Sequence, residues 1–220
     1  MDVSKASFSI IHEDDRLIAV EKPAGVLVVK GRGDGEGKPL AAQVQTYLNR
    51  KPFVVHRLDR ETSGVVLFAK TPAMHKELCT QFESRRIGKR YLAVVQGALE
   101  LAGTVDQPLR RFGSGRIGID PRGKNATTRY RPLETHDTAT LLHAFPETGR
   151  QHQIRVHLLS IGFPIIGDPL YHKNGSEQAP RMLLHAERLK ISLPDGEVLT
   201  FKSDPPADFQ DGYNLAKKAS

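Results

Sequence analysis

The segment VVHRLDRETSGVVLFAK at residues 54–70 constrains the fold of this chain more than any other stretch. Apolar runs at 54–55 and 65–68 flank nine residues that are mostly polar. Short apolar runs bounded by turn residues are typical of buried β-strands. The segment therefore predicts two strands that hold a polar loop between them, with residues 62–64 (Thr-Ser-Gly) allowing a tight turn.

One carboxylate, Asp59, lies in this loop with Arg57 and Arg60 close on either side. The plainer interpretation is an ion pair that braces the loop. The other is a reactive carboxylate, which the neighbouring cations would keep ionised as a nucleophile or base requires. Loops held by a rigid scaffold are where proteins often present reactive groups. The residues of the loop alone leave both interpretations open.

The remaining pattern is rich in strands, with a few interspersed helices. Further strands are predicted at 8–12, 17–21, 26–29, 90–97, 127–134, 138–145, 182–193 and 198–203. Helices are predicted at 39–48, from Thr71 into Arg85-Arg86 with Gly88 able to end it, and at 149–162. Residues 103–125 read as an extended, loop-rich basic arm. This order favours an α+β fold with a mixed or antiparallel central sheet over alternating βαβ units.

The formal net charge of +7 is concentrated in two blocks. Residues 50–90 carry a net +6 and residues 110–131 another +6, so the rest of the chain is mildly acidic, at −5. Two basic blocks on an acidic body indicate a polyanionic partner, with phosphate the first candidate. A basic face without a partner is the alternative interpretation.

Several classes of protein are disfavoured by the sequence. No apolar run approaches the roughly 18 residues of a membrane span, and residues 1–15 do not resemble a secretory signal. A single cysteine, Cys79, allows no internal disulfide and fits a reducing cytoplasm. Cys79 lies beside an apolar helical stripe at 74, 78 and 82, which favours packing over nucleophilic chemistry.

No cofactor or metal site is expected. The Gly-rich loop at 31–37 lacks the Gly-Lys-Ser/Thr ending of a P-loop. The nine histidines form no HExxH motif, and His152 and His157 have the wrong spacing for one helical face.

HRLDRETSGVVLFAK closely resembles the catalytic motif of the pseudouridine synthases, in their HRLD-motif (RluA-type) branch. Five more fragments resemble this family's motifs in the same order: LIAVEKPAGVLV, GKRYLAVVQG, KNATTRY, TGRQHQIRVHLLSIGFPIIGDPLY and LLHAERL. The resemblance covers roughly residues 8–205. It implies the pseudouridine synthase fold, with helices flanking a central sheet and an active-site cleft across its middle. Because the motifs begin near residue 8, we expect one catalytic domain over 1–220 without an N-terminal RNA-binding module.

The resemblance implies that the chain isomerises specific uridines of structured ribosomal or transfer RNA to pseudouridine. The base would be cut from C1′ at N1, turned while still bound, and reattached through C5, after being flipped out of its stack. No cofactor or metal is implied. We expect a monomeric cytoplasmic protein whose partner is RNA.

The resemblance also assigns catalytic roles to three residues. Asp59 would act at the ribose, either by adding to C1′ or by removing a C2′ proton to give a glycal, and the sequence does not choose between these routes. Tyr91 would stack on the target base. Arg155, on the helix at 149–162, would pair with Asp59 from a distant part of the chain.

Other residues are expected to bind the substrate. With Arg155 as the partner of Asp59, Arg57 and Arg60 are left for phosphates or the flipped nucleotide. Leu184 would form a wall of the uracil pocket. Further phosphate or base contacts are expected from Arg150, His152 and Gln153 near the helix start, and target selection from the arm at 103–131 through Arg110, Arg111 and Arg116.

Two functions of other classes stay open. The first is an RNA-binding or RNA-folding protein whose isomerase activity is absent or incidental. The second is a nucleoside or N-glycosidic hydrolase that uses Asp59. Glycosidases normally need two carboxylates flanking the bond, and the motif supplies no clear second acid, since Glu61 is only two residues away.

Overall fold

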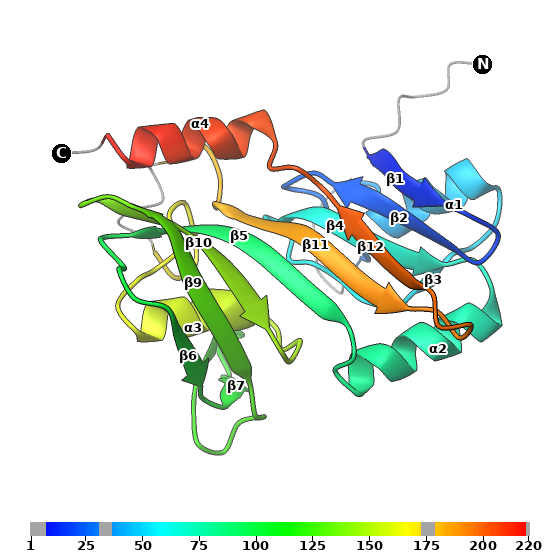
Figure 1. Cartoon of the computed structure of the whole chain (residues 1–220), viewed down its shortest axis with the longest axis horizontal. Helices are drawn as coiled ribbons and strands as arrows, with labels where there is room; N and C mark the ends of the chain where they lie inside the picture. The colour runs from blue at the N-terminus through cyan, green and yellow to red at the C-terminus, as the bar shows by residue number, and fades with distance from the viewer. Residues whose placement is uncertain (1–7, 31–36, 173–178, 219–220) are drawn as a thin grey trace. The chain divides into compact units, whose positions relative to one another are not determined.

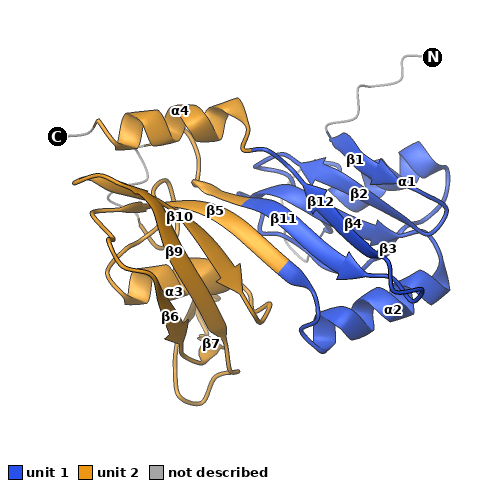
Figure 2. Ribbon diagram, viewed as in Figure 1, with its two compact units in different colours: residues 1–88, 186–204 blue, residues 89–185, 205–220 orange. Residues whose placement is uncertain are grey.

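The computed structural model describes residues 8–30, 37–172 and 179–218. The chain forms two compact units, each built from two stretches of sequence (Figure 2). Unit 1 comprises residues 1–88 and 186–204, and unit 2 comprises residues 89–185 and 205–220. The described residues contain four α-helices among many strands, which confirms the predicted α+β class. That 1–220 acts as one catalytic domain stays a prediction.

Unit 1 contains a sheet whose strands follow the order β1-β2-β4-β11, with β3 paired to β4 and β12 paired to β11 (Figure 1). The strands are β1 (Ser9–Glu13), β2 (Leu17–Lys22), β3 (Phe53–Val54), β4 (Ser63–Ala69), β11 (Leu184–Ser192, in this unit from residue 186) and β12 (Val198–Lys202). All seven residues of β4 are buried. This burial explains the near-continuous apolar run that made the strand readable from sequence.

Helices α1 (Leu40–Leu48) and α2 (Pro72–Glu83) complete unit 1. Helix α2 begins as predicted, because the Thr71 side chain accepts a hydrogen bond from Met74 N at 3.2 Å and Pro72 occupies the first turn. Met74 and Leu78 are buried in the core of this unit, and Phe82 packs against it. The predicted apolar stripe is therefore confirmed.

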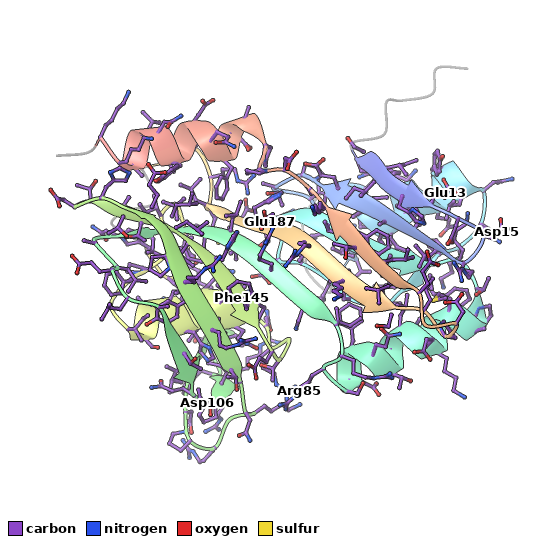
Figure 3. All side chains as sticks on the ribbon, viewed as in Figure 1. Glu13, Asp15, Arg85, Asp106, Phe145 and Glu187 are labelled. Carbon is purple, nitrogen blue, oxygen red and sulfur yellow. The ribbon has the colours of Figure 1, made fainter. Side chains whose placement is uncertain are left out.

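The C-terminal end of α2 differs from the prediction. The helix ends at Glu83 instead of running through 85–86 to Gly88, which instead starts a strand. Arg85, labelled in Figure 3, has φ 60°, a left-handed conformation that cannot continue a right-handed helix.

Unit 2 contains an antiparallel sheet in the order β5-β10-β9-β6. Its strands are β5 (Gly88–Gln96, in this unit from residue 89), β6 (Gly103–Asp106), β9 (Thr127–Thr135) and β10 (Ala139–Pro146). A separate hairpin pairs β7 (Leu109–Arg111) with β8 (Ile117–Ile119). Helices α3 (Gln153–Ser160) and α4 (Ala207–Ala216) belong to the same unit.

The two helices of unit 2 pack against opposite faces of β5. Ala93 and Val95 share a buried cluster with Ile154 and Leu158 of α3. Leu92 and Val94 share another with Phe209 of α4 and its neighbours. Alternate residues of a strand point to opposite faces, so β5 is covered on both sides (Figure 1).

The predicted strand at 26–29 is wrong. In this segment Leu27 O accepts a hydrogen bond from Leu40 N at 2.8 Å, and Val28 O accepts one from Ala41 N at 3.0 Å. These are N–H groups of the first turn of α1, which have no partner inside the helix. The segment therefore caps a helix, and its apolar residues are explained by burial, as at Val28.

The structure differs from the sequence prediction at four other places. The turn in the opening segment lies at 60–61, and residues 63–64 already belong to β4. Helix α3 begins at Gln153 and not at 149, because His152 has φ 54°. The arm at 103–125 contains β6, β7 and β8, and helix α4 was not predicted. Residues 31–36 of the predicted Gly-rich loop lie outside the described residues.

Candidate active site

Asp59 lies in unit 1, in the loop between β3 and β4, as predicted. The side chain is half-buried, the preceding Leu58 is buried, and Arg57 and Arg60 are exposed. A turn follows the carboxylate, in which Thr62 N donates to Asp59 O at 3.2 Å. Leu58 therefore anchors the loop while its charged residues lie nearer the surface.

A buried lysine holds this loop in place. The Lys22 side chain is fully buried, and its Nζ donates to Arg60 O at 2.8 Å, Val26 O at 2.6 Å and Pro23 O at 2.9 Å. A buried ammonium needs such partners to offset its desolvation. Lys22 thus ties the end of β2 to the residue following Asp59, a role that sequence reasoning missed although Lys22 directly follows a predicted strand.

His56 fixes the other end of the loop. Its Nε2 accepts a hydrogen bond from Leu67 N at 2.9 Å, and its ring stacks on Phe82 with centroids 4.8 Å apart. A ring nitrogen that accepts a hydrogen bond carries no proton. The first residue of the HRLD motif therefore has a structural contact with β4 and α2.

Gly64 sets how closely the loop approaches β11. Its φ is +113°, and a Cβ at this position would overlap the carbonyl oxygen of Ala186 and lie 2.7 Å from the Ala186 carbonyl carbon and nitrogen. Only glycine tolerates both the conformation and the contact. The glycine of the motif is therefore required where β4 packs against the backbone of β11.

We expect Gly64→Ala to lower the free energy of unfolding by at least about 2–3 kcal/mol, because a backbone clash adds to an unfavourable φ. Gly196→Ala is the matched control in the same unit, with φ +90° but nothing within 4 Å of the added Cβ. Its cost should be about 1–2 kcal/mol, from backbone strain alone. Denaturant unfolding of both variants measures the difference. Equal losses of unfolding free energy in the two variants would contradict a close approach of Gly64 to the backbone of Ala186.

In unit 2, the structure brings Tyr91 and Leu184 into one cluster. Leu184 is buried, and Tyr91 on β5 packs half-buried against the same group of side chains, which includes Ile154 of α3. Both residues were predicted to form the uracil site, and their shared cluster agrees with that hypothesis without testing it.

Arg155 on α3 makes a bidentate ion pair with Asp168. Its Nε donates to Asp168 Oδ2 at 2.7 Å and its Nη2 donates to Oδ1 at 2.8 Å, with both side chains buried. Burial by itself raises the pKa of Asp168, but the hydrogen bonds and charge of Arg155, with the N–H groups of Leu170 and Tyr171, outweigh it and lower that pKa. Sequence reasoning missed Asp168, which lies in the quoted GDPLY fragment.

Tyr171 completes this arrangement. The Arg155 guanidinium lies 4.9 Å from the centre of the Tyr171 ring. The hydroxyl of Tyr171 is 2.8 Å from Nδ1 of His152. Arg116 lies over the same ring at 5.6 Å and donates to Leu170 O at 2.6 Å. His152 and Arg116, both predicted to contact RNA, thus have protein partners in this unit.

Gln153 is buried, and both ends of its amide are occupied. Its Oε1 accepts from Thr148 Oγ1 at 2.5 Å and Arg150 N at 3.0 Å, and its Nε2 donates to Thr127 O and Thr128 Oγ1, each at 2.9 Å. An amide with all four hydrogen bonds made has little capacity left for RNA. The structure gives Gln153 the role of holding the start of α3 to β9.

The predicted arm arginines differ in their surroundings. The Arg110 Nη1 donates to Asp120 at 3.1 Å, and Arg122 contacts the same carboxylate through its backbone N and guanidinium. The hydrogen bonds from Arg122 hold the pKa of Asp120 well below its usual range. Arg110, Arg111 and Arg150 line one cavity.

Asp59 belongs to unit 1, whereas Tyr91, Arg155 and Leu184 belong to unit 2. Their meeting at one active-site cleft, including the Arg155–Asp59 pair, stays a prediction. Among the described residues, no group of three or more His, Cys, Asp or Glu side chains could hold a metal ion. In the same residues, no helix has the length and apolarity needed to cross a bilayer.

Comparison with known families identifies the family of the chain. The family model for RNA pseudouridylate synthases matches residues 16–160, more than half of the chain. The chain belongs to the RNA pseudouridylate synthase family. The matched segment of the chain includes Asp59, Tyr91 and Arg155, whereas Asp168 and Leu184 lie beyond its end.

Curated relatives of the chain support the same family. The ribosomal large subunit pseudouridine synthase D of Nitrosomonas europaea is 41% identical over 214 residues, which cover 90% of this chain and 62% of that protein. The protein of the same name from Haemophilus influenzae is 35% identical, covering 95% of this chain and 71% of the relative. An uncharacterised RNA pseudouridine synthase of Zymomonas mobilis is 35% identical, covering 92% and 95%. The chain thus spans less than two thirds of the Nitrosomonas protein but nearly all of the Zymomonas protein last named.

Solved structures confirm the predicted pseudouridine synthase fold. The human RNA pseudouridylate synthase domain containing 4 protein superposes with a TM-score of 0.75 at 26% identity, covering 94% of this chain and 92% of that one. The human domain containing 1 protein gives a TM-score of 0.79 at 25% identity, covering 94% and 87%.

Proposed function

We propose that this synthase isomerises uridine to pseudouridine in the RNA of the large ribosomal subunit. The observation that carries the proposal is the Asp59 loop, held by Lys22, His56 and Gly64 inside the segment that matches the family. The names of the relatives from Nitrosomonas and Haemophilus favour ribosomal over transfer RNA.

Asp59 acts at the ribose of the target uridine. In one route a carboxylate oxygen bonds to C1′ while the C1′–N1 bond breaks and the uracil leaves with the bonding electrons. In the other route the carboxylate takes the C2′ proton and a glycal forms as the same bond breaks. In both, the turned base then bonds through C5 to C1′. The Asp59–C1′ bond breaks as this bond forms in the first route, and Asp59 returns its proton to C2′ in the second. The C5 hydrogen is then lost as a proton, and N1 takes up a proton. No redox partner is needed in either route.

The other predicted residues support this step. Tyr91 stacks on the base beside Leu184, and Arg155 neutralises Asp59. In unit 2 the same guanidinium also pairs with Asp168, through its Nε and Nη2. Arg57 and Arg60, exposed on either side of Asp59, contact the phosphates of the flipped nucleotide. The enzyme works as a cytoplasmic monomer.

Release of tritium from RNA labelled at uridine C5 tests the proposal. Incubation with unmodified large-subunit ribosomal RNA should release tritium to water and leave pseudouridine in the digested RNA. Free uracil in place of pseudouridine would identify an N-glycosidic hydrolase. Tight RNA binding without release from ribosomal or transfer RNA would identify an RNA-binding protein.

A further inference from the structure

Unit 2 contains a cavity of about 460 Å³ whose lining is strongly basic. Three stretches of chain form it: the β7–β8 hairpin, the turn at 121–124 and the turn at 149–151. The five cations of its lining are Arg110, Arg111, Arg122, Lys124 and Arg150. Asp59, Tyr91 and Arg155 are not among the lining residues. The cavity is therefore a different set of groups from the predicted catalytic residues.

The backbone of this cavity is firmly held. Leu109 N donates to Lys124 O and Lys124 N donates to Leu109 O, both at 2.9 Å. Gly123 packs so closely that a Cβ there would lie 2.5 Å from the carbonyl carbon of Leu109. The Arg150 Nε donates to Asn125 O at 3.2 Å, which joins the third segment to the second. The backbone segments that carry the cations are thus joined to one another by hydrogen bonds.

Besides Arg150, the four other cations fall into two groups. Asp120 is buried and orients the guanidinium groups of Arg110 and Arg122. Among the residues that the structure describes, the side chains of Arg111 and Lys124 have no hydrogen-bond or ion-pair partner. The cavity therefore has a net positive charge even with Asp120 counted, and two of its cations are available to an external anion.

The size and the walls of the cavity indicate what kind of anion fits. A volume of about 460 Å³ lies in the range of small-molecule sites and exceeds the needs of one phosphate group. Leu109 and Ile117 contribute apolar side chains to the cavity lining, and a sugar or a base can pack against them. Arginine guanidinium groups also stack on unpaired bases.

We propose that this cavity binds an unpaired RNA nucleotide with its flanking phosphates, as an anchor additional to the uridine that reaches Asp59. The inference rests on the proposed function, which makes RNA the polyanion. The proposal replaces the general expectation that the basic arm at 103–131 selects the target RNA with a site of named residues. Arg111 and Lys124 bind phosphates, Arg150 joins them from outside the arm, and Arg116 braces Tyr171 instead.

The test compares two double variants that remove the same charge, each in an Asp59→Ala background that prevents turnover. R111Q/K124Q removes the two cavity cations without protein partners. R129Q/R131Q removes two exposed cations of β9, in the same unit and the same basic block but outside the cavity. The probe is unmodified large-subunit ribosomal RNA, with its dissociation constant measured over a series of salt concentrations.

R111Q/K124Q should weaken binding at least about 10-fold near physiological salt and reduce the slope of log K against log salt by roughly 1.4–1.8, since each phosphate contact contributes about 0.7–0.9. R129Q/R131Q should weaken it less than about 3-fold. Equal losses of RNA affinity in the two double variants would contradict the proposed site. Unchanged affinity in R111Q/K124Q, with an unchanged melting temperature, would contradict it as well. The readout is binding, so failure of the tritium assay would instead count against the proposed reaction.

Discussion

Asp59→Ala should abolish pseudouridine formation and leave the protein folded. The carboxylate is the only group that we place at the ribose, and neither alanine nor asparagine can bond to C1′ or take the C2′ proton as a carboxylate does. We therefore expect tritium release to fall by at least about 1,000-fold for Asp59→Ala and for Asp59→Asn. The RNA dissociation constant should change much less, because the phosphate contacts of other residues are retained.

Glu61→Gln is the control for Asp59. Glu61 is the other carboxylate of the same loop, is also half-buried, and lies two residues away. It has no role in the proposed reaction, so its variant should keep more than about a third of the wild-type rate. If Glu61→Gln were as inactive as Asp59→Asn, the chemistry would require two carboxylates, and the glycosidase-like alternative would gain support.

Asp168→Asn should be the most destabilising single change outside the cores. The substitution leaves the Arg155 guanidinium buried without its counter-charge, and breaking one half of a buried ion pair costs about 3–5 kcal/mol. In a chain of this size roughly 1 kcal/mol changes Tm by 2–4 °C, so Tm should fall by on the order of 10 °C. Denaturant unfolding and thermal melting measure the effect.

Asp208→Asn is the matched control in the same unit. Asp208 also accepts a hydrogen bond from a buried arginine, Arg181 at 3.2 Å, but 51% of its side chain is exposed. Solvent screening makes such a pair worth up to about 1 kcal/mol. A loss of stability for Asp168→Asn no larger than the loss for Asp208→Asn would show that the buried Arg155–Asp168 pair stabilises the fold no more than an exposed pair does.

The pH dependence of this effect has a definite sign. The pKa of Asp168 is lowered in the folded protein, so its contribution is complete above the unfolded pKa of about 3.9 and is lost as the pH falls through the folded value. The stability difference between wild type and Asp168→Asn should therefore be constant from about pH 7 to pH 5 and shrink below about pH 4. A difference that grew on acidification would contradict the lowered pKa.

Much of the fold could be predicted because its signals are local. The strands that became β2 and β4 are buried and nearly continuous in apolar residues, β5 has a buried apolar run at 92–95, and α2 has both a threonine cap and an apolar stripe. The errors occurred where local pattern and environment disagree. The apolar run 26–29 is buried where it caps α1 and does not form a strand. The arm at 103–125 contains strands that have few apolar residues, and the arginines and glycines between them obscure the alternating pattern.

The sequence by itself determined the α+β class, the position of the Asp59 loop and the residues that resemble the family, because periodicity, turn residues and motifs are properties of chain neighbours. Only the tertiary structure decided the partners: Lys22 with the carbonyl of Arg60, Arg155 with Asp168, Gln153 with β9, and three separate segments around one basic cavity. Buried charges and amides take whichever partners the packed chain places within about 3 Å. That selection depends on where distant segments meet, which local sequence pattern does not encode.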